Sequence, residues 1–225
     1  MHEIRLFPKR DNKLGFLCPC IETMFATIDA YIDYHCQTDQ LDVPYGYNER
    51  ATLSILAGAI WRNHPSNLVL EEFSMEKSWS KASYKGRQDI WFRVSKRECF
   101  GEAKQQWIPL SKVRTEAESY LAILESETSL AKQNLRNPKK IALGILFLVP
   151  SIRIGKIEHA RKNLEQHYKV LESAVGPWCE KQEYEVLWGK YSRDQLLEEK
   201  GCSEWSDGTF GSCPSLDTLI CTSAK

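Results

Sequence analysis

The sequence predicts an α/β protein with a mixed central β-sheet of about five strands flanked by helices, and two observations lead to this fold class. In the middle of the chain, a short polar turn joins two apolar strand segments, which is typical of a hairpin. In the second half, strand segments alternate with helical ones, which is typical of a sheet covered by helices. The 225 residues suffice for one sizeable core. We expect a single domain over residues 1–200, with a helical extension over about 1–45, and a tail over 201–225 that packs on the domain or extends from it.

The first half is expected to hold two helices followed by three strands. Apolar residues recur at spacings of three and four from residue 19 to about 38, and Asn48 is a suitable N-cap for a second helix over about Glu49–Asn63. The strand segments cover residues 68–75, 88–94 and 97–104. Because only Ser95-Lys96 separates the last two, they are predicted to form a hairpin.

The second half is expected to alternate helices and strands. Helical patterns cover about 112–133 and 157–175, and Gly176-Pro177 is expected to end the second. The nine-residue run "IALGILFLV" (141–149) is too short to span a bilayer and predicts a buried strand. A fifth strand is expected over 183–188. From Gly201 onward no clear period is visible, so no element is predicted there.

The charges balance overall but are unevenly distributed. The chain has 30 Lys and Arg and 30 Asp and Glu, which argues against a protein that binds by bulk charge. Between Lys77 and Arg114, however, ten basic residues stand against three acidic ones. Such a segment can hold a polyanion in a salt-dependent manner, although for any single lysine a solvated surface is the simpler explanation.

The N-terminal sequence "MHEIRLFPKRDNK" shows no apolar segment behind its charges, so no signal peptide is visible. We therefore expect a cytoplasmic protein without membrane association, whose eight cysteines are thiols. A zinc site formed by Cys18, Cys20, His35 and Cys36 is the weaker alternative, because this spacing departs from that of usual zinc ligands.

Three acidic residues and one lysine form the strongest candidate for a reaction site. Glu102 and Lys104 are two apart on a strand and therefore share a face. The turn brings Asp89, on the neighbouring strand, to the same end of the hairpin. Glu49 continues the apolar stripe of its helix by one turn, although a charge that favours the helix dipole is an alternative explanation. Since a carboxylate among apolar neighbours requires a compensating cation, Asp89 and Glu102 are candidate ligands of one metal ion.

This arrangement resembles the PD-(D/E)xK nuclease superfamily, which has the restriction-endonuclease-like fold. The segments "RQDIWF" and "CFGEAKQQW" resemble its strand-borne Asp and its Glu-x-Lys, thirteen residues apart, and the resemblance covers about residues 48–149. Gln88 stands where the name of the motif has Pro, at a position that varies in the superfamily.

The resemblance implies a Mg²⁺-dependent endodeoxyribonuclease with a restriction, repair or mobile-element role, in which Mn²⁺ substitutes for Mg²⁺. Asp89, Glu102, the carbonyl of Ala103 and Glu49 would bind the metal, because hard oxygen ligands suit Mg²⁺. Lys104 would orient the attacking water or stabilise charge on the phosphate. Glu71 and Glu72 are spare candidates, and Glu72 is preferred if its strand lies beside that of Asp89. Candidate contacts to DNA are Lys85, Arg87, Gln106, Lys112 and Arg114.

A second hypothesis keeps the fold but makes the chain a catalytically inactive module that binds nucleic acid or another protein. The neutral net charge and the lack of an obvious DNA-reading domain favour it. A homodimer also stays open, because many proteins of this superfamily act as dimers to cut two strands. The sequence leaves DNA versus RNA, and endonuclease versus exonuclease action, undecided.

Overall fold

The structure is a computed structural model of the whole chain and describes residues 2–37, 42–79, 82–110, 117–135, 139–153, 157–197, 203–204 and 210–224. Its helices are α1 (Cys18–Cys36), α2 (Glu49–Asn63), α3 (Ala117–Asn134) and α4 (Ile157–Gln182), with short 3-10 turns η1 (Lys13–Leu17), η2 (Pro44–Gly46) and η3 (Asp194–Leu197). Its strands are β1 (His2–Phe7), β2 (Leu68–Trp79), β3 (Ala82–Val94), β4 (Arg97–Pro109), β5 (Ile141–Arg153), β6 (Tyr184–Ser192), β7 (Ser203–Glu204), β8 (Phe210–Ser212) and β9 (Ser215–Ser223).

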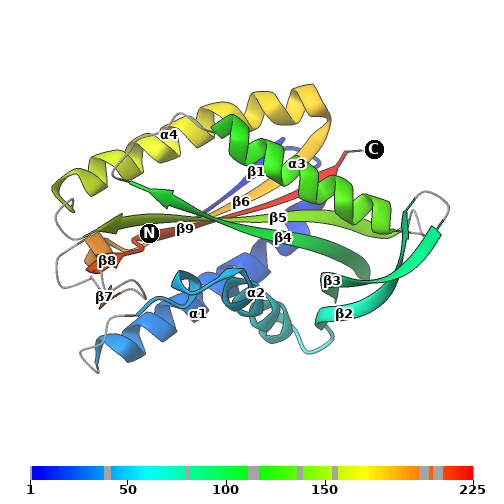
Figure 1. Cartoon of the computed structure of the whole chain (residues 1–225), viewed down its shortest axis with the longest axis horizontal. Coiled ribbons are helices and arrows are strands. Elements are labelled where there is room, and N and C mark those ends of the chain that lie inside the picture. Colours follow the sequence, from blue (N-terminus) through cyan, green and yellow to red (C-terminus); the bar gives the residue numbers. More distant parts are fainter. Residues whose placement is uncertain are drawn as a thin grey trace.

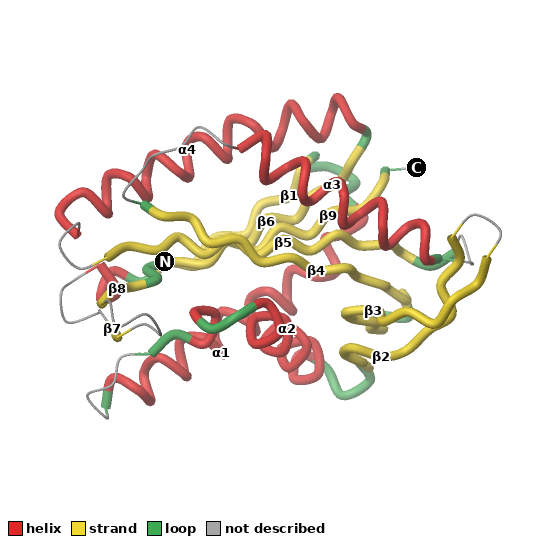
Figure 2. The backbone as a smooth tube through the Cα atoms, viewed as in Figure 1, coloured by secondary structure: helices red, strands yellow, loops and turns green. Residues whose placement is uncertain are grey.

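A mixed sheet forms the middle layer, with α1 and α2 on one face and α3 and α4 on the other (Figures 1 and 2). Within the described residues, seven strands lie side by side in the order β1-β6-β9-β5-β4-β3-β2, and the short β7 and β8 lie off this path. Strands β4 and β5 are parallel, and the other neighbours on the path are antiparallel. The predicted α/β class with a mixed, helix-flanked sheet is confirmed, but the sheet has more than the five expected strands.

Strand β5 lies at the centre and separates two apolar cores. Its side chains alternate, so that Ile145 and Phe147 pack toward α1 and α2 while Leu146 and Leu148 pack toward α3 and α4. All four are fully buried, as expected for the apolar run from which this strand was predicted. Gly144 allows α3 to lie close to the strand, because a Cβ there would approach the backbone of this helix to within 2.6 Å.

The two helices before the strands form where the sequence predicts them. Helix α2 begins after Asn48, whose side-chain oxygen accepts a hydrogen bond from the N–H of Ala51 at 3.0 Å. Helix α1 buries its apolar stripe, which includes Ile21, Phe25 and Ile28, against the sheet. The segment Lys13–Cys36 is long and apolar enough to cross a membrane by length and composition, a test that core helices also pass.

Both chain ends contain a strand where none was predicted, although the expected N-terminal extension also holds helix α1. Residues His2–Phe7 form a strand that pairs with β6, and Ser215–Ser223 forms a strand that lies between β5 and β6. The segment "SLDTLICTS" is buried along nearly its whole length, so its polar and apolar residues do not alternate as in a half-exposed strand. That is why no strand is predicted there.

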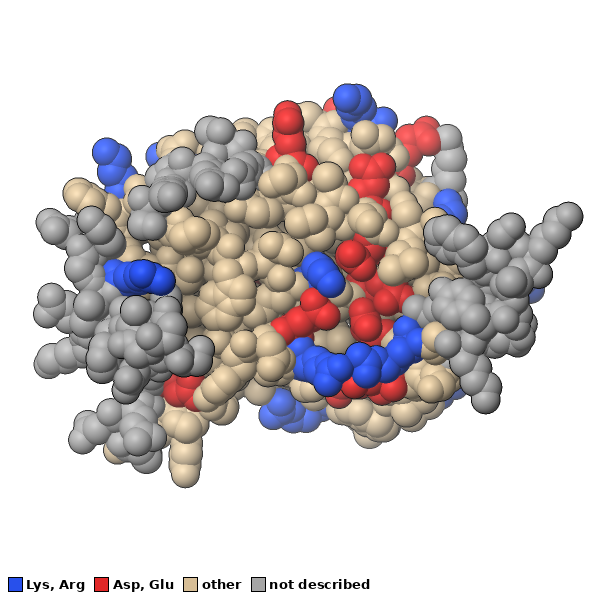
Figure 3. All heavy atoms as spheres, in the orientation of Figure 1, with Lys and Arg blue, Asp and Glu red and all other residues tan. Residues whose placement is uncertain are grey.

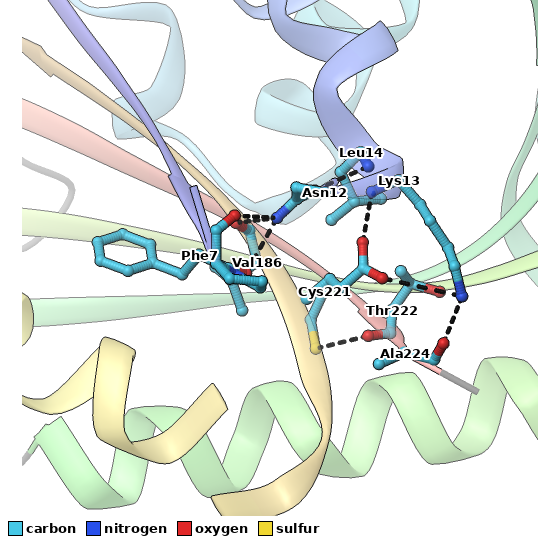
Figure 4. Close-up of polar contacts among 10 residues, drawn as sticks. Phe7, Asn12, Lys13, Leu14, Val186, Cys221, Thr222 and Ala224 are labelled. Atoms are coloured by element: carbon cyan, nitrogen blue, oxygen red, sulfur yellow. Dashed lines mark hydrogen bonds and ion pairs between the residues drawn. The ribbon is translucent and has the colours of Figure 1, made fainter. Parts of the chain in front are cut away.

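Polar contacts fasten the N-terminal segment to the end of the sheet (Figure 4). The side-chain nitrogen Nδ2 of Asn12 donates to the backbone carbonyls of Phe7 at 2.9 Å and Val186 at 3.3 Å. The backbone N–H of Lys13 donates to the carboxylate of Glu185, and its side chain donates to the carbonyl of Ala224 after β9. These contacts join β1, β6 and β9.

Helix α4 continues past the proline at which it was predicted to end. Pro177 lies inside the helix, which extends to Gln182. A proline in a helix interior costs about 3 kcal/mol. Beyond the proline, Cys179 is buried, and Trp178 stacks on Tyr184 at a centroid distance of 5.0 Å, so the last turn packs against the protein.

Candidate functional site

The β3–β4 hairpin forms as predicted, but its backbone ladder ends early. The strands pair from Val94 opposite Arg97 to Ile90 opposite Gly101. Beyond that point, side chains of β3 bind the backbone of β4. Gln88 donates to the carbonyl of Gly101 at 2.7 Å, and the carboxylate of Asp89 accepts from the N–H of Ala103 at 2.8 Å.

Glu49 binds the next donor along the same edge of β4. Its carboxylate accepts from the N–H of Gln105 at 3.1 Å. Peptide groups two residues apart point to the same edge of a strand, so Asp89 and Glu49 occupy successive donors of one edge. The carbonyl of Ala103 points to this edge as well, because both polar groups of a strand residue face the same neighbour. The structure therefore places Asp89, Glu49 and the Ala103 carbonyl along one edge of β4.

Glu102 and Lys104 lie on the face of β4 that is covered by α3. Strand alternation places them on the same face as Ile108, which packs in the core beneath α3 and α4. Glu102 is 4% exposed, and its carboxylate accepts a hydrogen bond from the side chain of Asn134 at 2.8 Å. Lys104 is exposed. The two residues predicted to share a face therefore differ in exposure, with Glu102 buried and Lys104 exposed.

Helix α3 adds a carboxylate that the sequence analysis missed. Burial raises the pKa of Glu127, Lys104 opposes this shift, and the negative charges of Asp89 and Glu49 add to it. Acidic and basic side chains lie next to one another in the middle of this face of the molecule (Figure 3). Glu127 lies three residues after buried Leu124, so the helical spacing places it beside the apolar stripe of α3. This spacing is the feature of the sequence from which its position near the sheet could have been predicted.

The donor chemistry fits Mg²⁺, but the ligand set is not assembled. Carboxylate and carbonyl oxygens are the hard ligands this ion prefers. Within the described part of the chain, however, no group of three or more His, Cys, Asp or Glu side chains is placed to hold a metal ion. One oxygen of each predicted carboxylate already accepts an N–H, from Ala103, Gln105 or Asn134.

The other predicted residues lie at varying distances from this edge. Strand β2 is adjacent to β3, as required for the choice of Glu72, but this carboxylate pairs with Arg50 at 2.6 Å and with Arg87 at 3.3 Å. Glu71 accepts a hydrogen bond from Ser54. Gln106 is half-buried on the face of β4 that holds Lys104. The side chain of Lys85, and Lys112 and Arg114 as whole residues, lie outside the described part of the chain.

The weaker zinc hypothesis is wrong for the residues that suggested it. Cys18 and Cys36 are the first and last residues of α1. At about 1.5 Å of rise per residue they are roughly 27 Å apart, too far to share one ion.

Comparisons with known proteins assign no family or function to this site. No family model, curated protein or solved structure matches this chain. The features at hand are two carboxylates on successive donors of one strand edge, a buried Glu and an exposed Lys on the adjoining face, and a further carboxylate from α3.

Proposed function

We propose that this chain is a Mg²⁺-dependent nuclease that hydrolyses phosphodiester bonds of DNA, with Mn²⁺ able to replace Mg²⁺. The observation that carries the proposal is the placement of Asp89 and Glu49 on successive N–H groups of β4, beside Glu102 and Lys104. Carboxylates that share a partly buried site repel one another, and a divalent cation removes that repulsion.

The order of the elements supports the same proposal. A helix with Glu49 precedes the strands, the hairpin carries Asp89 and Glu102, and a long helix leads into the buried strand β5, parallel to β4. This order is what the resemblance to the PD-(D/E)xK superfamily implies, and a restriction-endonuclease-like core over residues 49–153 belongs to the proposal.

In the proposed mechanism, Asp89, Glu49, Glu102 and the carbonyl of Ala103 would hold the cation, and the hydrogen bond from Asn134 orients the Glu102 carboxylate. The bound cation supplies Lewis acidity and lowers the pKa of an attacking water. Lys104 is exposed beside this edge and binds a phosphate oxygen, which places the phosphorus next to the water and stabilises the negative charge of the transition state.

A cleavage assay on labelled duplex DNA with Mg²⁺ or Mn²⁺ tests the proposal. We expect Asp89→Asn and Lys104→Ala each to lower the rate by on the order of 10²-fold or more, since each removes a group that acts on the reacting phosphate. Glu118→Gln, an exposed carboxylate elsewhere on α3, is the matched control and should leave the rate unchanged. Activity that survives both Glu102→Ala and Lys104→Ala contradicts the assignment.

One observation favours a second candidate function, an inactive nuclease-like module that binds nucleic acid or protein. Each predicted carboxylate accepts a protein N–H, so each has a structural role that needs no metal. Calorimetry with Mg²⁺ separates the two candidates. Tight binding that Asp89→Asn abolishes supports the enzyme, and no binding up to millimolar Mg²⁺ supports the module.

A further inference from the structure

A strongly basic pocket lies where β4 and β5 begin. It has a volume of about 660 Å³, and six of the eight residues that line it are Lys or Arg. They come from three segments that are distant in sequence: the start of η1, the tip of the β3–β4 hairpin and the residues just before β5. The lining residues are Lys13, Arg93, Lys96, Arg97, Glu98, Lys139, Lys140 and Ile141.

The charge of this pocket is only partly compensated by the protein. Glu98, the one acidic residue of the lining, pairs with Lys140 at 2.8 Å. Lys13 reaches Glu185 at 3.8 Å. Across the described residues, no ion pair involves the three cations of the hairpin tip, Arg93, Lys96 and Arg97. In a chain of zero net charge, this local excess creates a repulsion that a bound anion would relieve.

Aromatic rings hold two of the cations in place. The guanidinium of Arg97 lies over the ring of Phe16 at 4.6 Å, and the ammonium of Lys140 lies over the ring of Phe100 at 4.9 Å. Lys96 is held at the tip of the turn with a positive φ of 68°. The charged groups of Arg97 and Lys140 are therefore positioned in advance of any ligand, which lowers the entropic cost of binding.

We propose that this pocket binds phosphate groups of a nucleic-acid backbone. Seven of the eight lining residues are charged, whereas small-molecule pockets are lined predominantly by hydrophobic and aromatic side chains. The inference rests on the proposed function in taking nucleic acid as the ligand, and it adds a contact region outside the predicted set. Arg97 and Glu102 are five residues apart on β4, at most about 17 Å, so one nucleic acid can reach both the pocket and the carboxylates.

Fluorescence anisotropy of a labelled DNA duplex in EDTA tests the pocket without cleavage. For the 225-residue chain carrying Arg93→Ala and Arg97→Ala, we expect the dissociation constant to rise about tenfold at low salt. The slope of log K against log salt should become shallower by about 1.8, since two phosphate contacts are lost. Lys162→Ala with Lys169→Ala removes two exposed charges of α4 and is the matched control. Circular dichroism verifies that both variants are folded.

Each outcome of this experiment decides one question. The pocket proposal is overturned if the Arg93 and Arg97 variant has the same DNA affinity and salt slope as the parent chain. It is also overturned if inorganic tripolyphosphate displaces DNA at equal phosphate concentration, because the ligand of the pocket would then be a free polyphosphate. Pocket-dependent binding without any cleavage in Mg²⁺ supports the pocket while the nuclease proposal fails. If DNA is cleaved in a manner that requires Asp89 but the Arg93 and Arg97 variant binds DNA as the parent does, the nuclease proposal is supported and the pocket proposal fails.

Discussion

At the scale of single residues, side chains replace a neighbouring strand along one edge of β4. Gln88 and Asp89 bind peptide groups that the ladder with β3 leaves open, and Glu49 reaches the next donor from α2. Buried or half-buried peptide groups require such partners. Asp89 and Glu49 therefore stabilise the strand edge, and the same contacts place their carboxylates on successive donors of that edge.

The protonation of Glu127 should make stability depend on pH. Burial and the charges of Asp89 and Glu49 raise its pKa in the folded state, so the folded protein binds this proton more tightly than the unfolded chain. The resulting stability is fully present below the ordinary carboxyl pKa of 4.5 and is lost as the pH rises through the folded pKa. Glu127→Gln should remove this loss and raise the midpoint of thermal unfolding at neutral pH.

Thermal unfolding over a pH series, with and without Mg²⁺, measures this effect. Bound Mg²⁺ should reduce the difference in unfolding midpoint between the parent chain and Glu127→Gln, because the cation offsets the repulsion between Glu127 and the carboxylates of Asp89 and Glu49. Glu118→Gln serves as the control. The parent chain should lose stability relative to Glu127→Gln as the pH rises from about 4 to 7. If this difference in unfolding midpoint does not change with pH, the electrostatic explanation is wrong.

Sequence reasoning reached the residues of the hairpin but not those of the helix above it. Alternation along a strand fixes which residues share a face, so Glu102 and Lys104 could be paired from spacing alone. Glu127 and Asn134 reach β4 only because α3 docks at one particular height and rotation. That docking depends on long-range contacts, such as the close approach at Gly144, which periodicity does not encode.

At the scale of elements, the β3–β4 turn holds two non-glycine residues, one of them a lysine, in a backbone conformation that lowers stability. Ser95 and Lys96 both have positive φ, 49° and 68°, where Asn-Gly is the usual pair. Non-glycine residues in this region cost roughly 1–2 kcal/mol each. Ser95→Asn with Lys96→Gly should therefore stabilise the protein by about 1–2 kcal/mol in urea unfolding while reducing the salt slope of DNA binding by about 0.9.

The single variant Ser95→Gly is the control for this turn. It relieves strain at a residue without charge, so the stability should rise and the DNA affinity should stay the same. A double variant that is more stable and binds DNA as tightly as the parent would show that Lys96 does not contact phosphate.

The packing of α3 on β5 gives a second prediction at this scale. A Cβ at Gly144 would lie 2.6 Å from the backbone nitrogen of Thr128 and 2.7 Å from the carbonyl of Leu124, so the helix must move. Gly144→Ala should destabilise the protein by about 1–3 kcal/mol in urea unfolding. Gly58→Ala, in the middle of α2 with its nearest neighbour at 3.4 Å, should instead stabilise it by about 1 kcal/mol. Equal effects at both glycines would contradict this account of α3.

At the scale of the whole molecule, the α/β class follows from local patterns, and the width of the sheet does not. Strand β9 is polar enough to resemble a tail, and its burial depends on β5 and β6, which flank it on both sides. Strand β1 is six residues long, and partners near the opposite end of the chain define it. Both strands are therefore fixed by long-range pairing.

The zero net charge of the chain conceals two regions of opposite sign that share β4. The strand begins in the basic pocket and then passes the carboxylates of Asp89 and Glu49. Nucleic acid drawn to the pocket would be repelled by the carboxylates until a cation binds there. Affinity for DNA should therefore depend on metal even when no bond is cut.

Asp89→Asn should accordingly raise the affinity for DNA in EDTA. Removing one negative charge about 5 Å from a phosphate gains about 0.8 kcal/mol in water, roughly fourfold in the dissociation constant. Added Ca²⁺ should tighten binding by the parent chain and leave Asp89→Asn unchanged, and Glu118→Gln should behave as the parent. Anisotropy at fixed ionic strength separates these effects from screening. If Asp89→Asn instead weakens binding in EDTA, the bound DNA does not pass the carboxylate edge of β4, and pocket and edge serve different ligands.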